Sequence, residues 1–473
     1  MKIKSYLASY SYKFLLLLCL LTGGSILLYS CANQLPPSGG ENDIIPPQVV
    51  RISPEPNTTN FNGNSIEIEF DEYIDRRSFQ DALFISPQPK SPYEVNINGT
   101  EVEIYFPEGL DKNKTFSIYI GKDLKDVRNG NAITKPIQFA ISTGNKIDKG
   151  QISGQVYTRT PDRIIILAFN LFGKATVNPA VEVADFISQL DEEGNFVFQN
   201  LPGGRYRVFA LRDNDRNLIY DESFDELVMP VQDYEVADDK PVEDADFMVD
   251  HIGLIPGSEQ FYSILKPGPD KYIYSSVTDS SVNLPSDAKF YFYFKDNDIS
   301  RFQIADNLTL TDTNSGANYK LIYNWLSDSL LQVFSLQNFV YGADLRFTFD
   351  LTGTARGIIH TIDIKITDES NTGKISGQVF NDSLGIFPVF VRLYNNSDPF
   401  IFYSKVVEGN SLFSFPAVVK GKYSLFSFVD SNNDGEYSRG KVEPFEPAER
   451  FIFYSEDLDV KGRWTLDNVF LRF

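Results

Sequence analysis

The side chains best suited to chemistry lie in one Asp- and Asn-rich stretch, DSNNDGEYS at residues 430–438. Oxygen-bearing side chains stand at its first, third, fifth and ninth positions, and Gly435 stands at the sixth. Calcium takes about six to eight hard oxygen ligands, and this spacing supplies the first half of such a shell. The twelfth position is Lys441 rather than the Glu of an EF-hand, so Glu443 or water would have to complete the site. The predicted calcium ligands are Asp430, Asn432, Asp434, Glu436 and Ser438.

A second calcium candidate lies earlier in the chain. Asp213, Asp215, Asn217 and Asp221 repeat the spacing but lack the glycine. An Asx-rich turn at the end of a β-hairpin would explain both stretches equally, because Asp and Asn bond their own backbone and tolerate left-handed conformations. Calcium therefore stays one of two interpretations, and we expect no obligatory cofactor.

The chain offers little for catalysis. Its two histidines, His251 and His360, stand without a partner motif, and the sequence contains no G-x-S-x-G, Walker loop or H-E-x-x-H. Acidic pairs such as Asp225-Glu226 are interpreted as solvated faces or strand-end turns, since acidic residues are abundant throughout. We expect a protein that is not an enzyme.

The N-terminal stretch has the features of an export signal. Lysines precede an apolar run at residues 14–21, and the segment closes with Leu28-Tyr29-Ser30-Cys31, so residues 1–30 are predicted to be a signal peptide. The last four residues resemble a bacterial lipobox, which implies that Cys31 is lipidated and anchors the chain in a membrane. Ala32 follows the cysteine at the position where an Asp would resemble an inner-membrane retention signal, so the outer membrane is favoured. The alternative is an ordinary signal peptide followed by a free Cys31.

Composition narrows the fold and the partners. Cleavage before Cys31 would leave 40 basic and 64 acidic side chains, a net charge of −24, so we expect no nucleic-acid partner. Cys19 would leave with the signal, which excludes a disulfide in the mature chain. The 39 Phe and 25 Tyr residues favour pleated, half-buried surfaces. They predict an all-β chain in which aromatic side chains fill sandwich cores rather than form carbohydrate platforms.

The first predicted domain follows a tether rich in Pro and Gly at residues 31–46. Residues 47–145 contain short alternating runs such as SIEIEF and EVEIYF, which are broken by Asn, Gly and Pro clusters, as in an antiparallel sandwich. Pro46-Pro47, Asp71-Glu72, Leu124-Lys125-Asp126 and Gly130-Asn131 resemble the bacterial Ig-like domain of S-layer proteins and Bacteroidota lipoproteins. The resemblance implies a spacer or adhesive module with no catalytic centre.

A different module is predicted at residues 148–250. It begins with ISGQV, continues through DEEGNFVF and LPGG, and ends in the strand RYRVFA. This order resembles the transthyretin-like carboxypeptidase regulatory domain, which is an appendage in enzymes and implies no peptidase here. Glycines at the tight turns supply the positive φ that such turns require.

The pair of modules recurs. ISGQV at residues 375–379 repeats residues 152–156 letter for letter, so residues 373–473 are predicted to be a second transthyretin-like domain. Residues 255–370 again show short strands, including FYFYF at residues 290–294, and are predicted to be a second Ig-like domain. Duplicated β modules of this kind predict an extended rod or arc in which neighbours touch end to end.

These observations lead to alternative functions. The first is a non-catalytic outer-membrane lipoprotein that acts as a protein-binding scaffold, by analogy an accessory subunit of an outer-membrane β-barrel machine. The alternative is a cell-surface adhesin or glycan binder. The cell surface is favoured over the periplasmic face, and Asp328-Ser329-Leu330 and Asp382-Ser383-Leu384 resemble a Bacteroidota O-glycosylation acceptor, which would place glycans on Ser329 and Ser383.

Overall fold

The computed structural model describes residues 43–238, 240–250, 253–269, 271–279, 281–296, 299–380, 387–454 and 456–473. The predicted signal peptide, Cys31, His251 and Ser383 lie outside these ranges. Within them, no helix combines the length and the apolar character needed to cross a membrane. The chain is all-β, as predicted, and forms sandwiches in tandem, which we name units I to IV in chain order.

Unit I spans residues 49–142. One sheet has the order β1 (Val49–Ser53), β2 (Ser65–Phe70), β5 (Glu101–Tyr105), β4 (Glu94–Asn98), and the other has the order β3 (Leu83–Ser86), β6 (Thr115–Ile120), β7 (Ile137–Ser142). The short helix α2 (Arg76–Ala82) joins the sheets and is capped by Asp75. In β2 the predicted alternation holds, because Ile66, Ile68 and Phe70 are buried while Glu67 is exposed. Strand β6 is buried on both faces, because unit II lies against it.

Unit II spans residues 150–248. Its larger sheet has the order β10 (Phe186–Gln189), β9 (Ile164–Asn170), β12 (Gly204–Arg212), β13 (Glu226–Val228), and β14 (Tyr234–Val236) also pairs with β12. The smaller sheet has the order β11 (Asn195–Leu201), β8 (Gly150–Tyr157), β15 (Phe247–Met248), in which β15 runs parallel to β8.

Unit III spans residues 259–366 and begins with helix α3 (Glu259–Ile264). One sheet has the order β16 (Lys266–Pro267), β17 (Ile273–Ser275), β19 (Phe290–Phe294), β22 (Leu330–Ser335), β21 (Leu321–Trp325). The other has the order β18 (Ser281–Leu284), β24 (Ile358–Ile366), β23 (Asp344–Leu351), β20 (Leu308–Asp312). Helix α4 (Arg301–Asp306) lies between β19 and β20, as α2 lies between β2 and β3 in unit I.

Unit IV spans residues 372–472 and follows a 3-10 turn at Glu369–Asn371. Its strands are β25 (Thr372–Phe380), β26 (Pro388–Asn395), β27 (Phe402–Glu408), β28 (Leu412–Val419), β29 (Gly421–Val429), β30 (Phe451–Phe453), β31 (Leu458–Val460) and β32 (Thr465–Arg472). The sheet orders β27-β26-β29-β30 and β28-β25-β32 repeat those of unit II strand for strand, with β31 on β29 as β14 is on β12.

The repeated ISGQV motif has a packing explanation. A Cβ on Gly154 would lie 2.3 Å from the carbonyl oxygen of Ala245, and one on Gly377 would lie 2.0 Å from that of Val469. Both glycines therefore let the last segment of their unit approach the first strand more closely than any side chain permits. The tyrosines of the recurring Gly-x-Tyr strands also act alike, since Tyr206 Oη donates to Pro202 O at 3.0 Å and Tyr423 Oη donates to Val419 O at 2.8 Å.

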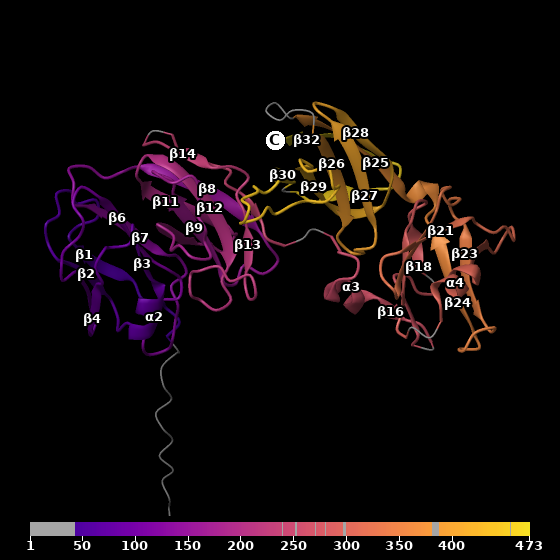
Figure 1. Cartoon of the computed structure of the whole chain (residues 1–473), viewed down its shortest axis with the longest axis horizontal. Helices are drawn as coiled ribbons and strands as arrows, with labels where there is room; N and C mark the ends of the chain where they lie inside the picture. Colours follow the sequence, from indigo (N-terminus) through magenta and orange to yellow (C-terminus); the bar gives the residue numbers. More distant parts are fainter. Residues whose placement is uncertain are drawn as a thin grey trace, which may run out of the picture.

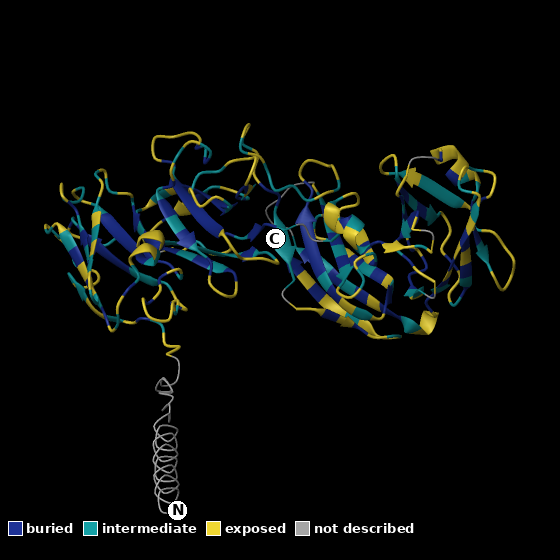
Figure 2. Ribbon diagram, turned by 90° about the horizontal axis from the view of Figure 1, so that it is seen from below, coloured by how far each residue is buried: buried dark blue, intermediate teal, exposed yellow. Residues whose placement is uncertain are grey.

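The units do not follow one another in space as they do in sequence. Figure 1 shows unit IV, in yellow, between unit II, in magenta, and unit III, in orange. The predicted arrangement of chain neighbours touching end to end is therefore wrong at the step from unit II to unit III. Unit IV lies beside unit II because the two units share an apolar contact. The buried strands of both units appear dark blue in Figure 2.

Candidate metal site and surfaces between the units

The stretch at residues 213–225 is a loop closed by two buried carboxylates. Asp213 accepts the backbone N–H groups of Asn217 at 3.1 Å and Leu218 at 3.0 Å. Asp225, 8% exposed, accepts the N–H groups of Asn214 at 2.8 Å and Asp221 at 3.0 Å. The two side chains together hold both halves of the loop.

The stretch at residues 430–449 is closed in the same way. Asp430 accepts the N–H groups of Asp434 at 3.1 Å and Gly435 at 3.0 Å. Glu449, 3% exposed, accepts those of Ser431 at 2.7 Å and Ser438 at 3.0 Å. The hydrogen bonds reach the same loop positions as in unit II, so the Asx-rich turn explains why both sequences carry these letters.

The acid that completes the second loop is Glu449, whereas the sequence suggested Glu443. Glu443 is exposed. Glu449 comes later because ten residues, 439–448, separate it from the ninth loop position, where the first loop has only three, 222–224. The sequence did not single out Asp225 as a loop-closing acid. Of the two interpretations given for it, a solvated face is wrong and a strand-end turn is correct, because Asp225 is buried directly before β13. An alignment of the two loops could have identified Asp225 and Glu449. Each loop needs a second acceptor for the N–H groups at its second and ninth positions.

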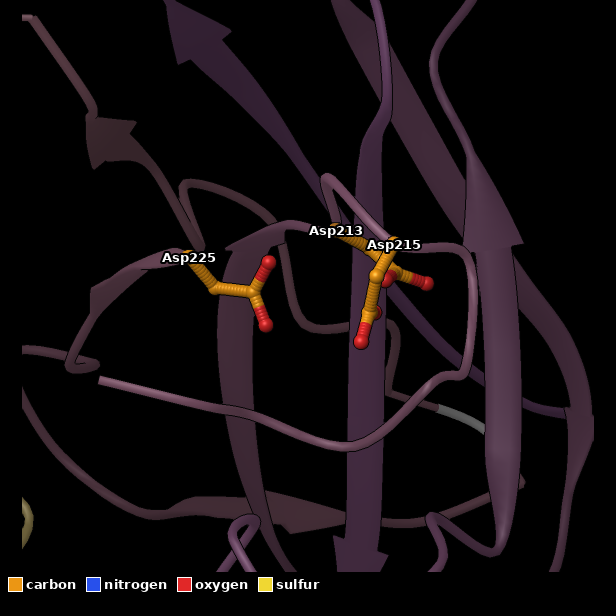
Figure 3. Close-up of side chains that lie close together, drawn as sticks. All are labelled: Asp213, Asp215 and Asp225. Atoms are coloured by element: carbon orange, nitrogen blue, oxygen red, sulfur yellow. The ribbon is translucent and has the colours of Figure 1, made fainter. Parts of the chain in front are cut away.

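Only the first loop brings carboxylates together among the described residues. Oxygen atoms of Asp213, Asp215 and Asp225 lie within 4.8 Å of one another, and Figure 3 shows Asp225 pointing toward the other two. Burial raises the pKa of Asp213, and a side-chain hydrogen bond with Asp215 raises it further. The backbone N–H groups that Asp213 accepts lower the pKa, but their effect is smaller. Three carboxylates from one tight loop could bind a hard cation such as Ca²⁺.

The other predicted ligands are spread out. Asn217 donates its Nδ2 hydrogen to Asp215 at 2.7 Å, and Asp221 accepts from Ser223 at 2.8 Å. In the second loop, Asn432 donates to Asp434 at 2.9 Å, and Glu436 pairs with Arg392 at 2.9 Å. Ser438 Oγ accepts from the N–H of Gly440 at 3.2 Å. The sequence ranked the second loop first because of Gly435, but the carboxylates converge in the first.

The described residues show no arrangement typical of catalysis. His360 is buried in β24 opposite Phe349, and its ring lies 6.0 Å from that of Phe349. Ser329 is half-buried in the turn before β22.

Two grooves lie between units. A groove of about 610 Å³ separates units III and IV, and one of about 1200 Å³ separates units I and II. The smaller groove is lined by residues 284–290 of unit III and by β27 and β28 of unit IV. The larger is lined by α2, β3, β9 and β10 and reaches Asp213 and Asp215. These volumes fall within or near the range of about 300–1000 Å³ that is common for ligand sites.

Units II and IV form a closed contact. The 439–448 segment of unit IV covers the outer face of the larger sheet of unit II, where Val442, Phe445 and Ala448 pack against its apolar side chains. Backbone hydrogen bonds run from Met229 N to Arg439 O and from Ala448 N to Pro230 O, both at 3.1 Å. Beside them, Met248 and Tyr157 of unit II enter an aromatic cluster of unit IV.

Comparison with known families assigns the first unit. Residues 43–143 match the model of the bacterial Ig-like domain, which identifies a β-sandwich module and no enzymatic domain. Comparison with curated proteins finds no match.

Solved structures of surface proteins show a distant likeness. The major pilin subunit of Bacillus cereus is 10% identical, with 68% of this chain and 99% of that chain covered and a TM-score of 0.15. Domains 1–6 of the surface layer protein SbsC are 10% identical, with 91% and 55% covered and a TM-score of 0.16. A tetra-tandem repeat of a large adhesion protein is 10% identical, with 84% and 95% covered and a TM-score of 0.14.

Proposed function

We propose that this chain is a non-catalytic adhesin of the cell envelope, which holds a row of β-sandwiches away from a membrane and binds other macromolecules through its outer surfaces. The lipobox-like Leu28-Tyr29-Ser30-Cys31 supports a lipid anchor, and Ala32 supports the outer membrane. The Ig-like match of unit I supports a spacer or adhesive module.

One observation carries this proposal. The contact between units II and IV joins the four sandwiches into one continuous body (Figure 1). Grooves lie between units I and II and between units III and IV. Such a body presents surfaces at fixed spacing, which suits binding at a distance from the anchor.

The experiment that tests the proposal has two parts. Protease treatment of intact cells that carry a C-terminally tagged chain measures exposure, and attachment of the cells to host or neighbour surfaces, with and without the gene, measures adhesion. We expect degradation of the chain on intact cells and loss of attachment without it.

Mild cross-linking followed by detergent purification distinguishes the other role. An adhesin purifies without a fixed companion. A β-barrel protein that co-purifies in constant ratio, together with protection from external protease, would contradict the proposal and point to an accessory subunit of an outer-membrane machine.

A further inference from the structure

Units II and IV have equivalent sheet edges, but the two edges have different neighbours. In unit II the edge strands are β10 and β11, and strands β3 and β6 of unit I lie directly beside them. Gln189 in β10 seals this contact, since its Oε1 accepts the backbone N–H of Lys122 at 3.3 Å. Strands of another unit therefore contact this edge in the first half, beside the groove of about 1200 Å³.

The equivalent edge of unit IV is open. Its edge strands are β27 and β28, and the groove of about 610 Å³ lies between them and unit III. Among the described residues, no strand of unit III approaches β27 or β28 as closely as β3 approaches β10. Strand β27 is also longer than β10, with seven residues against four.

The exposed side chains of β27 favour a protein ligand. Phe402 is 36% exposed and Val406 is 48% exposed, although both belong to a regular strand that pairs with β26 along its whole length. The ammonium group of Lys289 in unit III lies 5.6 Å from the ring of Phe402, and the groove is also lined by Lys405 and by the acids Asp287, Glu369 and Asp398. A long edge strand with exposed apolar side chains is a template for pairing with another strand.

Lys405 determines which strand fits. It is the central residue of β27, so symmetric antiparallel pairing of two copies of this strand would place Lys405 opposite Lys405. Like charges directly opposite one another destabilise a strand pair, whereas opposite charges stabilise it. The strand therefore disfavours a second copy of itself and favours a segment with a carboxylate at the facing position.

We propose that β27 is a docking edge for an extended segment of a protein partner with a carboxylate opposite Lys405, which adds to the sheet as its sixth strand and places apolar side chains beside Phe402 and Val406. The segment would enter the groove between units III and IV and pair with β27, at the edge equivalent to the one that β3 of unit I contacts in the first half. This inference rests on the proposed binding function and names one surface that performs it.

The test uses the full mature chain in detergent, immobilised through a C-terminal tag and panned with random dodecapeptides displayed on phage. Synthetic copies of the selected peptides are then titrated by fluorescence anisotropy. We expect peptides that contain Asp or Glu, and we expect Lys405→Glu to weaken their binding by at least about fivefold. The matched control is Lys374→Glu, an exposed lysine on the other sheet of unit IV.

Hydrogen exchange supplies a second measurement that does not depend on a variant. Addition of a strand protects alternate backbone amides of β27, because every second N–H of an edge strand points outward. Peptides that bind equally to the Lys405→Glu chain, or that leave exchange in β27 unchanged, would overturn the inference, and so would dimerisation of the chain through this edge in sedimentation. Attachment of whole cells that is the same with Lys405→Glu would overturn it too, while the proposed adhesive function would stand.

Discussion

The guanidinium group of Arg207 in unit II lies 3.6 Å from the ring centroid of Phe445 in unit IV. Arg207 is held in place by Asp233, whose carboxylate accepts from Nε at 2.7 Å and from Nη2 at 3.0 Å. The stacked ring thus covers a buried ion pair. Phe445 belongs to the 439–448 segment, which separates Glu449 from the rest of its loop. One inserted segment therefore joins the two halves of the chain.

Replacement of Phe445 by alanine should loosen this contact. The loss of a desolvated cation–π pair costs about 2 kcal/mol, and the buried area of the ring adds to it. We expect faster exchange of the Met229 amide, which donates to Arg439 O, and a larger radius of gyration in small-angle X-ray scattering. The control is Phe172→Ala, whose ring is 93% exposed. Equal exchange in the two variants would show that the contact does not depend on Phe445.

Asp126 should stabilise unit I in a pH-dependent manner. Its carboxylate accepts the N–H groups of Asn129 at 2.6 Å, Gly130 at 3.2 Å and Asn131 at 2.8 Å. Burial would raise the pKa of Asp126, but these backbone donors outweigh it and lower the pKa. Because the pKa of Asp126 is lower in the folded chain than in the unfolded chain, its charge stabilises the fold at pH values above the unfolded pKa of about 3.9. This stabilisation is lost as the pH falls through the folded pKa.

Asp126→Asn should therefore destabilise unit I by about 1–3 kcal/mol at pH 7, and the difference from the original chain should shrink below about pH 4. Hydrogen exchange in strand β7, measured in mild denaturant at both pH values, gives the free energy of opening. Asp123→Asn, at an exposed position close by, serves as the control. A destabilisation that is the same at pH 7 and pH 3 would contradict the role of the charge.

Gly377→Ala should disrupt unit IV. The added Cβ would lie 2.0 Å from Val469 O and 2.7 Å from the ring of Phe413, so β32 must move away from β25. Overpacking of this kind costs about 1–3 kcal/mol. Urea unfolding followed by the fluorescence of Trp464 would report it, and Gly353→Ala, where nothing lies within 4 Å of the new Cβ, should leave the curve unchanged. An unaltered midpoint for Gly377→Ala would show that the strands are free to separate.

Calcium, if it binds, should prefer the first loop. Calorimetric titration should give a dissociation constant of roughly 10⁻⁴–10⁻³ M, the range of extracellular modules. Asp215→Asn removes an exposed carboxylate of the Asp213, Asp215 and Asp225 group and should abolish the heat of binding, whereas Asp434→Asn in the second loop should preserve it. Loss of binding with Asp434→Asn alone would reverse the assignment, and titrations without heat for the original chain would leave both loops as structural turns.

The sequence alone was enough to predict the sandwich class and the main strands. Alternation such as that of Ile66, Ile68 and Phe70 is a local property, because a strand turns successive side chains to opposite faces whatever lies beyond it. The two copies of ISGQV likewise share one local need, the close approach of a last segment to a first strand at Gly154 and Gly377.

The tertiary structure alone decided which units touch and which acids close the loops. Phe445 and Arg207 carry no pattern that pairs them, since their contact depends on where a sheet face of one unit is left apolar and uncovered. Asp225 and Glu449 occupy equivalent places at different distances along the chain, because an insertion shifts the sequence but not the N–H groups that need an acceptor. Contacts between residues far apart in the chain are fixed by packing, and packing leaves no period in the sequence.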